Sequence, residues 1–555
     1  MVTSDYVIVG GGTAACVLAR RLSEDSAITV HVVEAGSEAN SPFVRIPLGF
    51  VHLFTSPRMN WCYTTVPQAD AGGRSIYAPA GKLLGGSSSI NGMVYMRGHS
   101  KDYDNWSDLG NDGWSYRELL PYFIKSERNA VWHGSPYHGN AGLLSVDNLR
   151  DVNAASKAFL KAAELCGIAP CTDFNIPNPD GVGIRQVTQY RGCRASAETA
   201  YLAPIRRRPN LRVSTNAVVD RIRFQGTRAV GIRYRIGHRD FEANAGREVI
   251  LSAGAFGSPS ILMRSGVGAA RKLMDIQIPV VRDVPGVGEN LQDHATVSLV
   301  YATRSIEPYG ISAQALPSLC WHAIKYLLGR RGLFASNVNE AGAFVRSSPG
   351  VVRPDLQLSL MPVRRGTQSL LGYGHGYTAT ATLLRPASRG HVTIANHHPF
   401  SQPVIDPRYL SSDSDVATLR RGLILARQIL GSSPFGEFRS TELLPGPTLQ
   451  NDHHIDAYIR GNSGSAFHPV GTCAMGRGGT AVVDKQLRVH GLQGLRVVDA
   501  SIMPTIVAGN TCAPTMMIAE KAADMILGRT PPVAPQLDGR TLADTSRESL
   551  KAHAQ

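Results

Sequence analysis

The first residues able to do chemistry are a glycine turn and an acid near the start of the chain. Gly10 permits a tight turn, Gly12 lets the backbone approach a pyrophosphate, and the small Ala15 allows close helix packing. Glu34 stands where an acid accepts hydrogen bonds from an adenosine ribose, and it argues against a 2′-phosphate. An ordinary βαβ turn without a ligand is the alternative. With the acid in register, dinucleotide binding is the stronger interpretation.

Two strands and a helix must position these groups. Residues 5–9 and 28–33 are apolar runs, and residues 17–22 between them have helical apolar spacing. Unpaired N–H groups at the N-terminus of such a helix attract an anion. The pattern predicts the first βαβ unit of a parallel, Rossmann-like sheet.

Two further glycine-rich segments suit a bound cofactor. Residues 81–91 form a Gly/Ser loop that can bring backbone N–H groups against a ligand. Residues 254–268 contain a glycine turn, a helix start predicted at Ser258, which precedes Pro259, and a closing glycine turn.

Two later segments carry polar groups. Residues 467–476 set His468 among small residues and a proline. Residues 499–501 lead to residues 509–517, at the start of the last predicted helix. Taken alone, His468 would be interpreted as a structural histidine, so its meaning depends on the other segments.

Together these segments resemble the glucose-methanol-choline (GMC) family of flavin-dependent alcohol oxidoreductases over nearly the whole chain. Residues 81–104 match the first family signature, and residues 254–268 match the second without a gap. Residues 468–476, 499–501 and 510–521 are similar to the bacterial choline dehydrogenase and acceptor-linked alcohol dehydrogenase branch. The L-sorbose dehydrogenase type is also similar. The resemblance implies FAD as the cofactor.

The resemblance also implies where FAD binds. The glycine turn and Glu34 would hold the ADP half, Lys82 would line the flavin side, and adenine would meet the main chain near Val218 or Val219. Some members attach FAD covalently through a histidine at the position of Ile90, so non-covalent binding is expected here. The expected FAD-contacting residues are Gly10, Gly12, Thr13, Ala14, Glu34, Lys82, Gly85, Gly86, Ser87, Asn91, Gly92, Val94, Val218, Asp499 and Ala500.

The resemblance places catalysis on two side chains. His468 matches the active-site histidine of the family, and Asn510 matches a second position that holds His or Asn. Alcohol oxidation moves a hydride to flavin N5 and removes the hydroxyl proton, a task suited to neutral histidine. We therefore expect His468 to remove the proton and Asn510 to hold the alcohol oxygen. His294 is expected to brace the FAD-binding domain, and Cys512 replaces the asparagine usual in close relatives.

The predicted function is oxidation of a primary alcohol to an aldehyde, with electrons passed to a quinone or another acceptor. Choline is one candidate, because Trp61, Phe467 and Glu340 could supply an aromatic cage and an acid. These residues do not decide the substrate, and a general alcohol is preferred. The alternatives are an oxidase that forms hydrogen peroxide and a flavoprotein that does not oxidise alcohols. No metal site is expected.

The chain of 555 residues is too long for one compact core. The predicted fold class is α/β, with a discontinuous Rossmann-like FAD-binding domain and an inserted α+β substrate domain on an antiparallel sheet. Strands at residues 355–361, 377–384 and 391–395 belong to that sheet. The predicted boundaries are 1–155, 210–295 and 465–530 for the FAD-binding domain, 156–209 and 296–464 for the substrate domain, and 531–555 for a flexible tail.

The basic balance allows several partners. Lys and Arg number 57 against 43 Asp and Glu, a net charge of +14. Nucleic-acid binding is not expected, because no binding module is visible. Residues 321–334 combine apolar spacing with a basic end and could lie on a membrane surface, although a packed helix is preferred. With no spanning stretch and no leader, a cytoplasmic location is expected, and peripheral attachment to the inner face of the cell membrane is the alternative. The sequence does not predict the oligomeric state.

Overall fold

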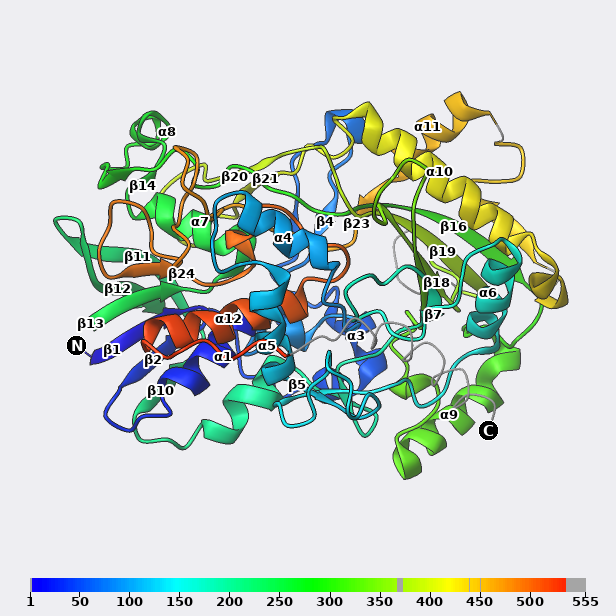
Figure 1. Cartoon of the computed structure of the whole chain (residues 1–555), viewed down its shortest axis with the longest axis horizontal. Coiled ribbons are helices and arrows are strands. Elements are labelled where there is room, and N and C mark those ends of the chain that lie inside the picture. The colour runs from blue at the N-terminus through cyan, green and yellow to red at the C-terminus, as the bar shows by residue number, and fades with distance from the viewer. Residues whose placement is uncertain (1, 367–372, 439, 450, 536–555) are drawn as a thin grey trace.

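The first sheet combines segments that are far apart in the chain. The computed structural model describes residues 2–366, 373–438, 440–449 and 451–535, and Figure 1 shows this sheet on the left. The strand order is β10-β2-β1-β13-β12-β11, and β24 pairs with the end of β13. The strands are β1 (Val2–Val9), β2 (Val30–Val33), β10 (Leu211–Ser214), β11 (Ala217–Gln225), β12 (Arg228–Ile236), β13 (Arg239–Leu251) and β24 (Leu495–Val497).

The long strand β13 joins a parallel half of this sheet to an antiparallel half. Strands β10, β2, β1, β13 and β24 run parallel, whereas β11, β12 and β13 pair antiparallel. Helices α1 (Thr13–Leu22) and α12 (Cys512–Ile526) pack together beside the parallel half. Arg21 on α1 forms buried ion pairs with Glu520 and, at 2.9 Å, with Asp524 of α12. The first and last helices are thereby fixed to each other at the βαβ unit.

Helix α7 (Gly254–Arg264) begins earlier than predicted. The predicted start at Ser258 is wrong, because Pro259 lies inside the helix. A proline leaves the carbonyl four residues earlier without its helical partner. Here that carbonyl, on Ala255, accepts a hydrogen bond of 2.6 Å from the Thr472 hydroxyl, so the helix continues through the proline.

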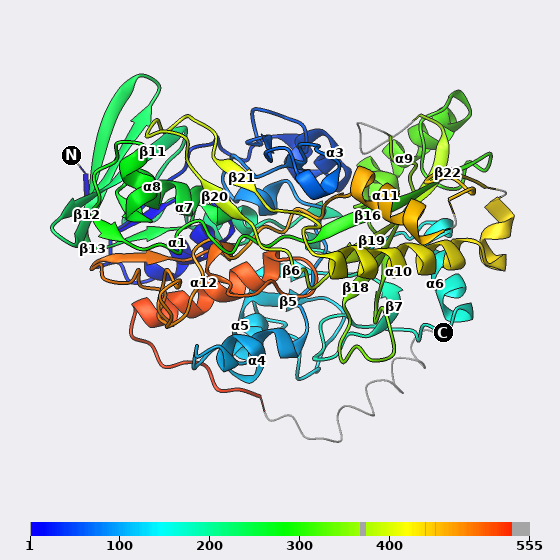
Figure 2. The same ribbon diagram turned by 90° about the horizontal axis from the view of Figure 1, so that it is seen from above.

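The second sheet is antiparallel, with the order β22-β16-β19-β18-β17-β7 and β23 beside β16. Helix α10 (Asp413–Leu430) lies along it, as Figure 2 shows. Gly422 of α10 permits the close approach, since an added Cβ would lie 2.9 Å from a Leu356 methyl group. The strands are β7 (Gly181–Ile184), β16 (Ala295–Thr303), β17 (Ala341–Val345), β18 (Leu356–Met361), β19 (His375–Leu383), β22 (Thr441–Leu444) and β23 (Gly464–Ser465).

Side chains of β18 and β19 alternate between two environments. Leu358 and Ala381 belong to the core beneath α10, whereas Gln357, Ser359 and Thr380 line a cavity. This alternation is the normal consequence of successive strand residues pointing to opposite faces. The second sheet therefore presents a polar face to the cavity.

These two sheets confirm the predicted fold class, while the domain boundaries stay a prediction. One strand was assigned to the wrong sheet: β20 (His391–Thr393) pairs only with β21 (Val404–Asp406) among the described residues. The helix predicted in residues 321–334 is α9 (Leu316–Gly329), which begins and ends earlier. Of the predicted tail, residues 536–555 lie outside the described residues.

The remaining elements are short and surround the two sheets. They are α2 (Pro42–Arg45), α3 (Phe50–Leu53), α4 (Ser100–Asp108), α5 (Tyr116–Ser126), α6 (Ala154–Leu165), α8 (Ala270–Asp275), α11 (Asp452–Asn462), β3 (Tyr63–Thr64), β4 (Tyr77–Ala78), β5 (Glu127–Asn129), β6 (Leu144–Val146), β8 (Gln189–Tyr190), β9 (Cys193–Arg194), β14 (Val267–Gly268) and β15 (Arg282–Asp283).

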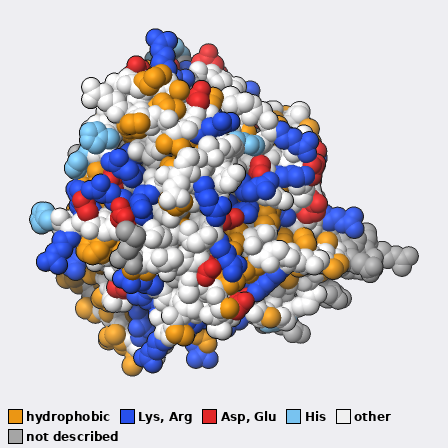
Figure 3. All heavy atoms as spheres, turned by 90° about the vertical axis from the view of Figure 1, so that its left-hand side faces the viewer, with side chains coloured by type: hydrophobic (Ala, Val, Ile, Leu, Met, Phe, Trp, Pro, Cys, Tyr) orange, Lys and Arg blue, Asp and Glu red, His pale blue; other side chains and the backbone are white. Residues whose placement is uncertain are grey.

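Surface charge is mixed on the face drawn in Figure 3, which is the left-hand side of Figure 1. Lys and Arg side chains there are interspersed with Asp, Glu and uncharged groups. The net positive charge of the chain therefore does not form a continuous basic surface on this face.

Candidate active site

A cavity of about 660 Å³ is lined by residues of both sheets and their loops. It brings together most of the residues predicted to bind cofactor or substrate. Those that line it are Gly10, Gly12, Thr13, Ala14, Glu34, Trp61, Lys82, Gly86, Ser87, Asn91, Gly92, Val94, Val218, Phe467, His468, Asp499, Ala500 and Asn510. Gly85 and Glu340 are not among the lining residues.

The glycines at one end of the cavity differ in what surrounds them. At Gly10, φ is +97°, and an added Cβ would lie 2.5 Å from the Ser252 carbonyl oxygen, so the fold itself requires this glycine. At Gly12 an added Cβ would be 3.7 Å from that same oxygen, and at Gly92 it would meet nothing within 4 Å. The protein does not need glycine at these two positions for space. Backbone without side chains at the N-terminus of α1 can approach a bound diphosphate closely. We call the part of the cavity lined by Gly10, Gly12, Glu34 and Asp499 the cofactor end.

Two carboxylates line the cofactor end and are held by backbone donors. Glu34 accepts the N–H groups of Gly11 at 2.5 Å and Gly36 at 2.7 Å, and burial raises its pKa to about 7. Asp499 accepts the Gly254 N–H at 2.9 Å and three donors from serines. Glu34 keeps lone pairs for ribose hydroxyls, whereas Asp499 primarily fixes the loop that borders the cavity.

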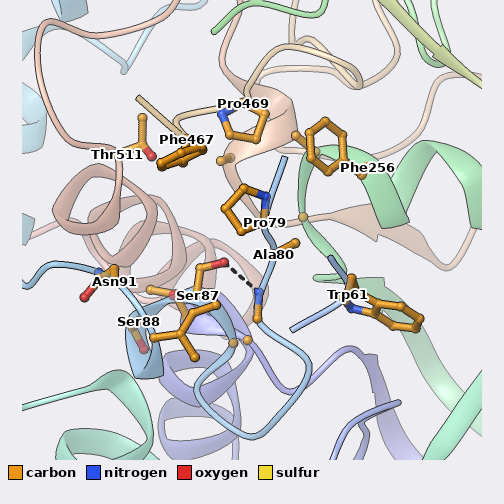
Figure 4. Close-up of a pocket in the computed structure, with 18 of the residues that line it drawn as sticks. Trp61, Pro79, Ala80, Ser87, Ser88, Asn91, Phe256, Phe467, Pro469 and Thr511 are labelled. Carbon is orange, nitrogen blue, oxygen red and sulfur yellow. Dashed lines mark hydrogen bonds between the residues drawn. The ribbon is translucent and has the colours of Figure 1, made fainter. Parts of the chain in front are cut away.

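Loop residues form the middle of the cavity, shown in Figure 4. The Gly81 N–H donates to the Ser87 hydroxyl at 3.1 Å, which closes the Gly/Ser loop. The ammonium of Lys82 lies 4.6 Å from the ring centroid of Trp61, and Trp61 stacks on Tyr63. Trp61 is therefore already in contact with a cation of the protein.

The two predicted residues outside the lining have structural contacts. Gly85 has φ of +82°, and an added Cβ would lie 2.2 Å from the Ser89 hydroxyl. Glu340 is fully buried and accepts hydrogen bonds from the Asn153 N–H and from the hydroxyls of Ser156 and Ser336. These contacts account for both residues without a ligand.

His468 and Asn510 meet at the cavity wall. Nδ2 of Asn510 donates to Nε2 of His468 at 2.9 Å, and Oδ1 of Asn510 is buried without a partner among the described residues. Burial lowers the pKa of His468 to about 4. The ring is therefore neutral near pH 7, with Nε2 as its hydrogen-bond acceptor.

His294, which is expected to brace the FAD-binding domain, lies against the active-site histidine. Its Nδ1 lies 3.0 Å from Nδ1 of His468. Burial and the neighbouring His468 hold the pKa of His294 well below its usual range, so it too is neutral. With Nε2 of His468 accepting, Nδ1 of His468 carries the proton and donates to His294. No local sequence signal indicates this contact, because the two residues meet only through tertiary structure.

A buried carboxylate holds both histidines in place. Asp293 accepts the backbone N–H groups of His294 and His468, each at 2.8 Å, and the hydroxyls of Tyr409 and Ser465. Phe467, just before the active-site histidine, has φ of +65°. This conformation is uncommon for a non-glycine residue, and here it shapes the backbone immediately before His468.

The polar face of the second sheet carries positive charge, and we call this face, together with the cavity wall that holds His468 and Asn510, the substrate end. Arg365 lines the cavity, and no carboxylate lies within ion-pair distance of it among the described residues. Behind the wall, Arg185 is buried and donates to Asn339 at 2.7 Å and Ser359 at 2.6 Å, both of which line the cavity. Burial lowers the pKa of Arg185 to about 9, so it stays charged at neutral pH. The lining carboxylates in the described part of the chain are Glu34 and Asp499, at the cofactor end.

Comparison with known proteins supplies an independent view. Residues 4–296 and 386–519 match the N- and C-terminal family models described as GMC oxidoreductase. The alcohol dehydrogenase [acceptor] of Pseudomonas putida is 42% identical, covering 94% of this chain and 95% of that protein. The oxygen-dependent choline dehydrogenase of Brucella anthropi is 40% identical, covering 95% and 96%. The crystal structure of pyridoxine 4-oxidase from Mesorbium loti is 32% identical with a TM-score of 0.86, covering 95% and 100%.

Proposed function

This chain belongs to the GMC oxidoreductase family, and we propose that it oxidises a primary alcohol that carries no positive charge to the aldehyde. The family binds FAD, which confirms the predicted cofactor. At the cofactor end, the glycine backbone suits the diphosphate of FAD and the Glu34 carboxylate suits its ribose hydroxyls. Ile90, which lines the cavity, offers no nucleophile, so we propose that FAD is held without a covalent bond.

The pair of His468 and Asn510 carries the proposal. FAD, when bound, supplies the acceptor for the two electrons of alcohol oxidation. The substrate hydroxyl donates to Nε2 of His468 in place of the Asn510 amide, whose N–H turns to the alcohol oxygen. Nε2 then takes the hydroxyl proton, and the Nδ1–H of the same ring remains directed at His294. Both histidines are neutral before the reaction, so Nε2 of His468 can accept the proton.

The charges at the substrate end argue against choline. A quaternary ammonium needs aromatic faces and a nearby acid. Trp61 already contacts Lys82, Glu340 does not line the cavity, and Arg365 does. These charges do not suit a cationic substrate, and an aliphatic or aromatic alcohol fits better. The acceptor we propose is a quinone or a similar electron carrier.

Anaerobic absorption spectra of the purified, flavin-containing protein test this proposal. We expect a medium-chain primary alcohol or benzyl alcohol to bleach the oxidised flavin band, and choline to bleach it far less. Faster bleaching by choline would establish choline dehydrogenase activity instead. Rapid recovery in air would identify an oxidase. A fully flavinated sample that no alcohol bleaches would favour a non-catalytic flavoprotein.

A further inference from the structure

Helix α9 presents its apolar side to solvent. The exposed fractions are 86% for Leu328, 74% for Leu327, 59% for Leu316, 55% for Trp321 and 44% for Ile324. A helix on the surface of a globular protein normally turns such residues toward the core. Figure 1 shows α9 at the lower right, at the margin of the molecule.

The exposed residues of α9 form one continuous face. At 3.6 residues per turn they span an arc of roughly 140°, from Leu316 to Trp321, and Cys320 falls inside it. Lys325 lies beyond the edge of this arc, with its ammonium 5.7 Å from the Trp321 ring centroid. We call this arc the apolar face of α9.

Positive charge accompanies the apolar face. Residues 308–339 contain no Asp or Glu, but they include Lys325, Arg330 and Arg331. Arg330 is exposed beyond the C-terminus of the helix, and Arg150 donates to the Gly329 and Arg330 carbonyls there. The nearest ion-pair partner is Asp151, 3.5 Å from Arg331. An apolar face bordered by cations is complementary to a bilayer with anionic headgroups.

The opposite side of α9 leads to the substrate end of the cavity. Leu319 packs against a small cluster that contains Leu333, Val338 and Val363. Val338 and Val363 line the cavity. The side of α9 opposite its apolar face therefore packs against a cluster that includes lining residues of the cavity.

We infer that α9 docks this protein on the surface of an anionic lipid bilayer. A helix of 14 residues is about 21 Å long, too short to cross a bilayer core of about 30 Å. Among the described residues, moreover, no helix has the length and apolar content of a membrane span. The helix would lie in the plane of the interface with Leu327 and Leu328 inserted. The inference does not depend on the identity of the substrate.

Sedimentation with lipid vesicles tests the inference on the full-length, flavin-containing protein. We expect binding to vesicles of phosphatidylcholine mixed with phosphatidylglycerol, and weaker binding to phosphatidylcholine alone. The double variant Leu327→Glu with Leu328→Glu should lower the apparent partition coefficient by roughly tenfold or more, because charges replace the two leucines that would insert into the bilayer. The matched control is Met274→Glu on α8, where Met274 is 61% exposed.

Two readouts separate lipid binding from other uses of this face. Trp321 fluorescence should shift to the blue with mixed vesicles, and the Trp321→Phe variant should lose that shift while still sedimenting. Equal sedimentation of wild type and double variant, or no sedimentation of either, would overturn the inference. So would a change from dimer to monomer in the double variant without vesicle binding, which would make α9 a contact between two copies of this chain.

Discussion

The two ends of the cavity are built differently. The cofactor end consists mainly of backbone at a glycine turn and at the start of α1. The protein leaves space around Gly12 in this region. The substrate end consists of side chains from separate strands and loops, such as Thr380, Ser359 and Arg365. Backbone geometry is set by short stretches of sequence, whereas the substrate end exists only after the second sheet has formed. A substitution at the substrate end should therefore lower turnover without loss of FAD, and a substitution at the cofactor end should weaken FAD binding.

The largest effect is expected from His468→Ala. Turnover should fall by ~10²–10⁴-fold, the usual contribution of a positioned base, while FAD stays bound. The measurement is steady-state turnover together with the flavin content of the purified variant. His453→Ala, a change at an exposed histidine, is the matched control. Unchanged turnover would remove His468 from the proposed mechanism, and loss of flavin would show that the two ends are not independent.

The Gly12→Val substitution should weaken FAD binding without unfolding the protein. Its Cβ has room against the protein, 3.7 Å from the Ser252 oxygen, so the apoprotein should fold with a near-normal melting temperature. The added methyl groups occupy cofactor space, at a cost of about 1–3 kcal/mol, which corresponds to roughly 5- to 150-fold weaker FAD binding. Titration of apoprotein with FAD measures this. Gly350→Val, at a glycine with open space around it, is the control, and equal FAD affinity in both variants would contradict the assignment.

The difference between the ends also explains what the sequence could predict. The βαβ unit and the glycine turns depend on local spacing, so Gly10, Gly12 and Glu34 were predicted to line one site, and they do. The contact of His294 with His468 joins residues 174 positions apart and has no local signature. The alternation of residue types along β18 and β19 is visible in the sequence, but the sequence does not indicate which face of the sheet lines the cavity. Glu340 has the right chemistry for a cation and lies outside the cavity lining.

A smaller effect is expected from Arg365→Glu. Reversing one charge in the cavity should raise the kcat/KM for choline relative to an uncharged alcohol on the order of tenfold, given the interaction of charges about 6 Å apart across a water-filled cavity with a dielectric constant near 80. Arg365→Gln, which only removes the charge, should give an intermediate ratio. The measurement compares both substrates in all three proteins. An unchanged ratio would show that Arg365 does not set the charge preference of the substrate end.

The smallest effect is expected from pH. The proposed base must be neutral, and burial lowers the pKa of His468 to about 4, so the base is lost only as the pH falls through that value. Between pH 8 and pH 6 the rate of anaerobic flavin reduction should change by less than about twofold, whereas an unperturbed histidine near 6.5 would lose about fourfold. Stopped-flow reduction at saturating alcohol measures this. An acid limb near pH 6.5 would mean that water solvates the protonated ring. The substrate end would then lack the burial on which its neutral histidine pair depends.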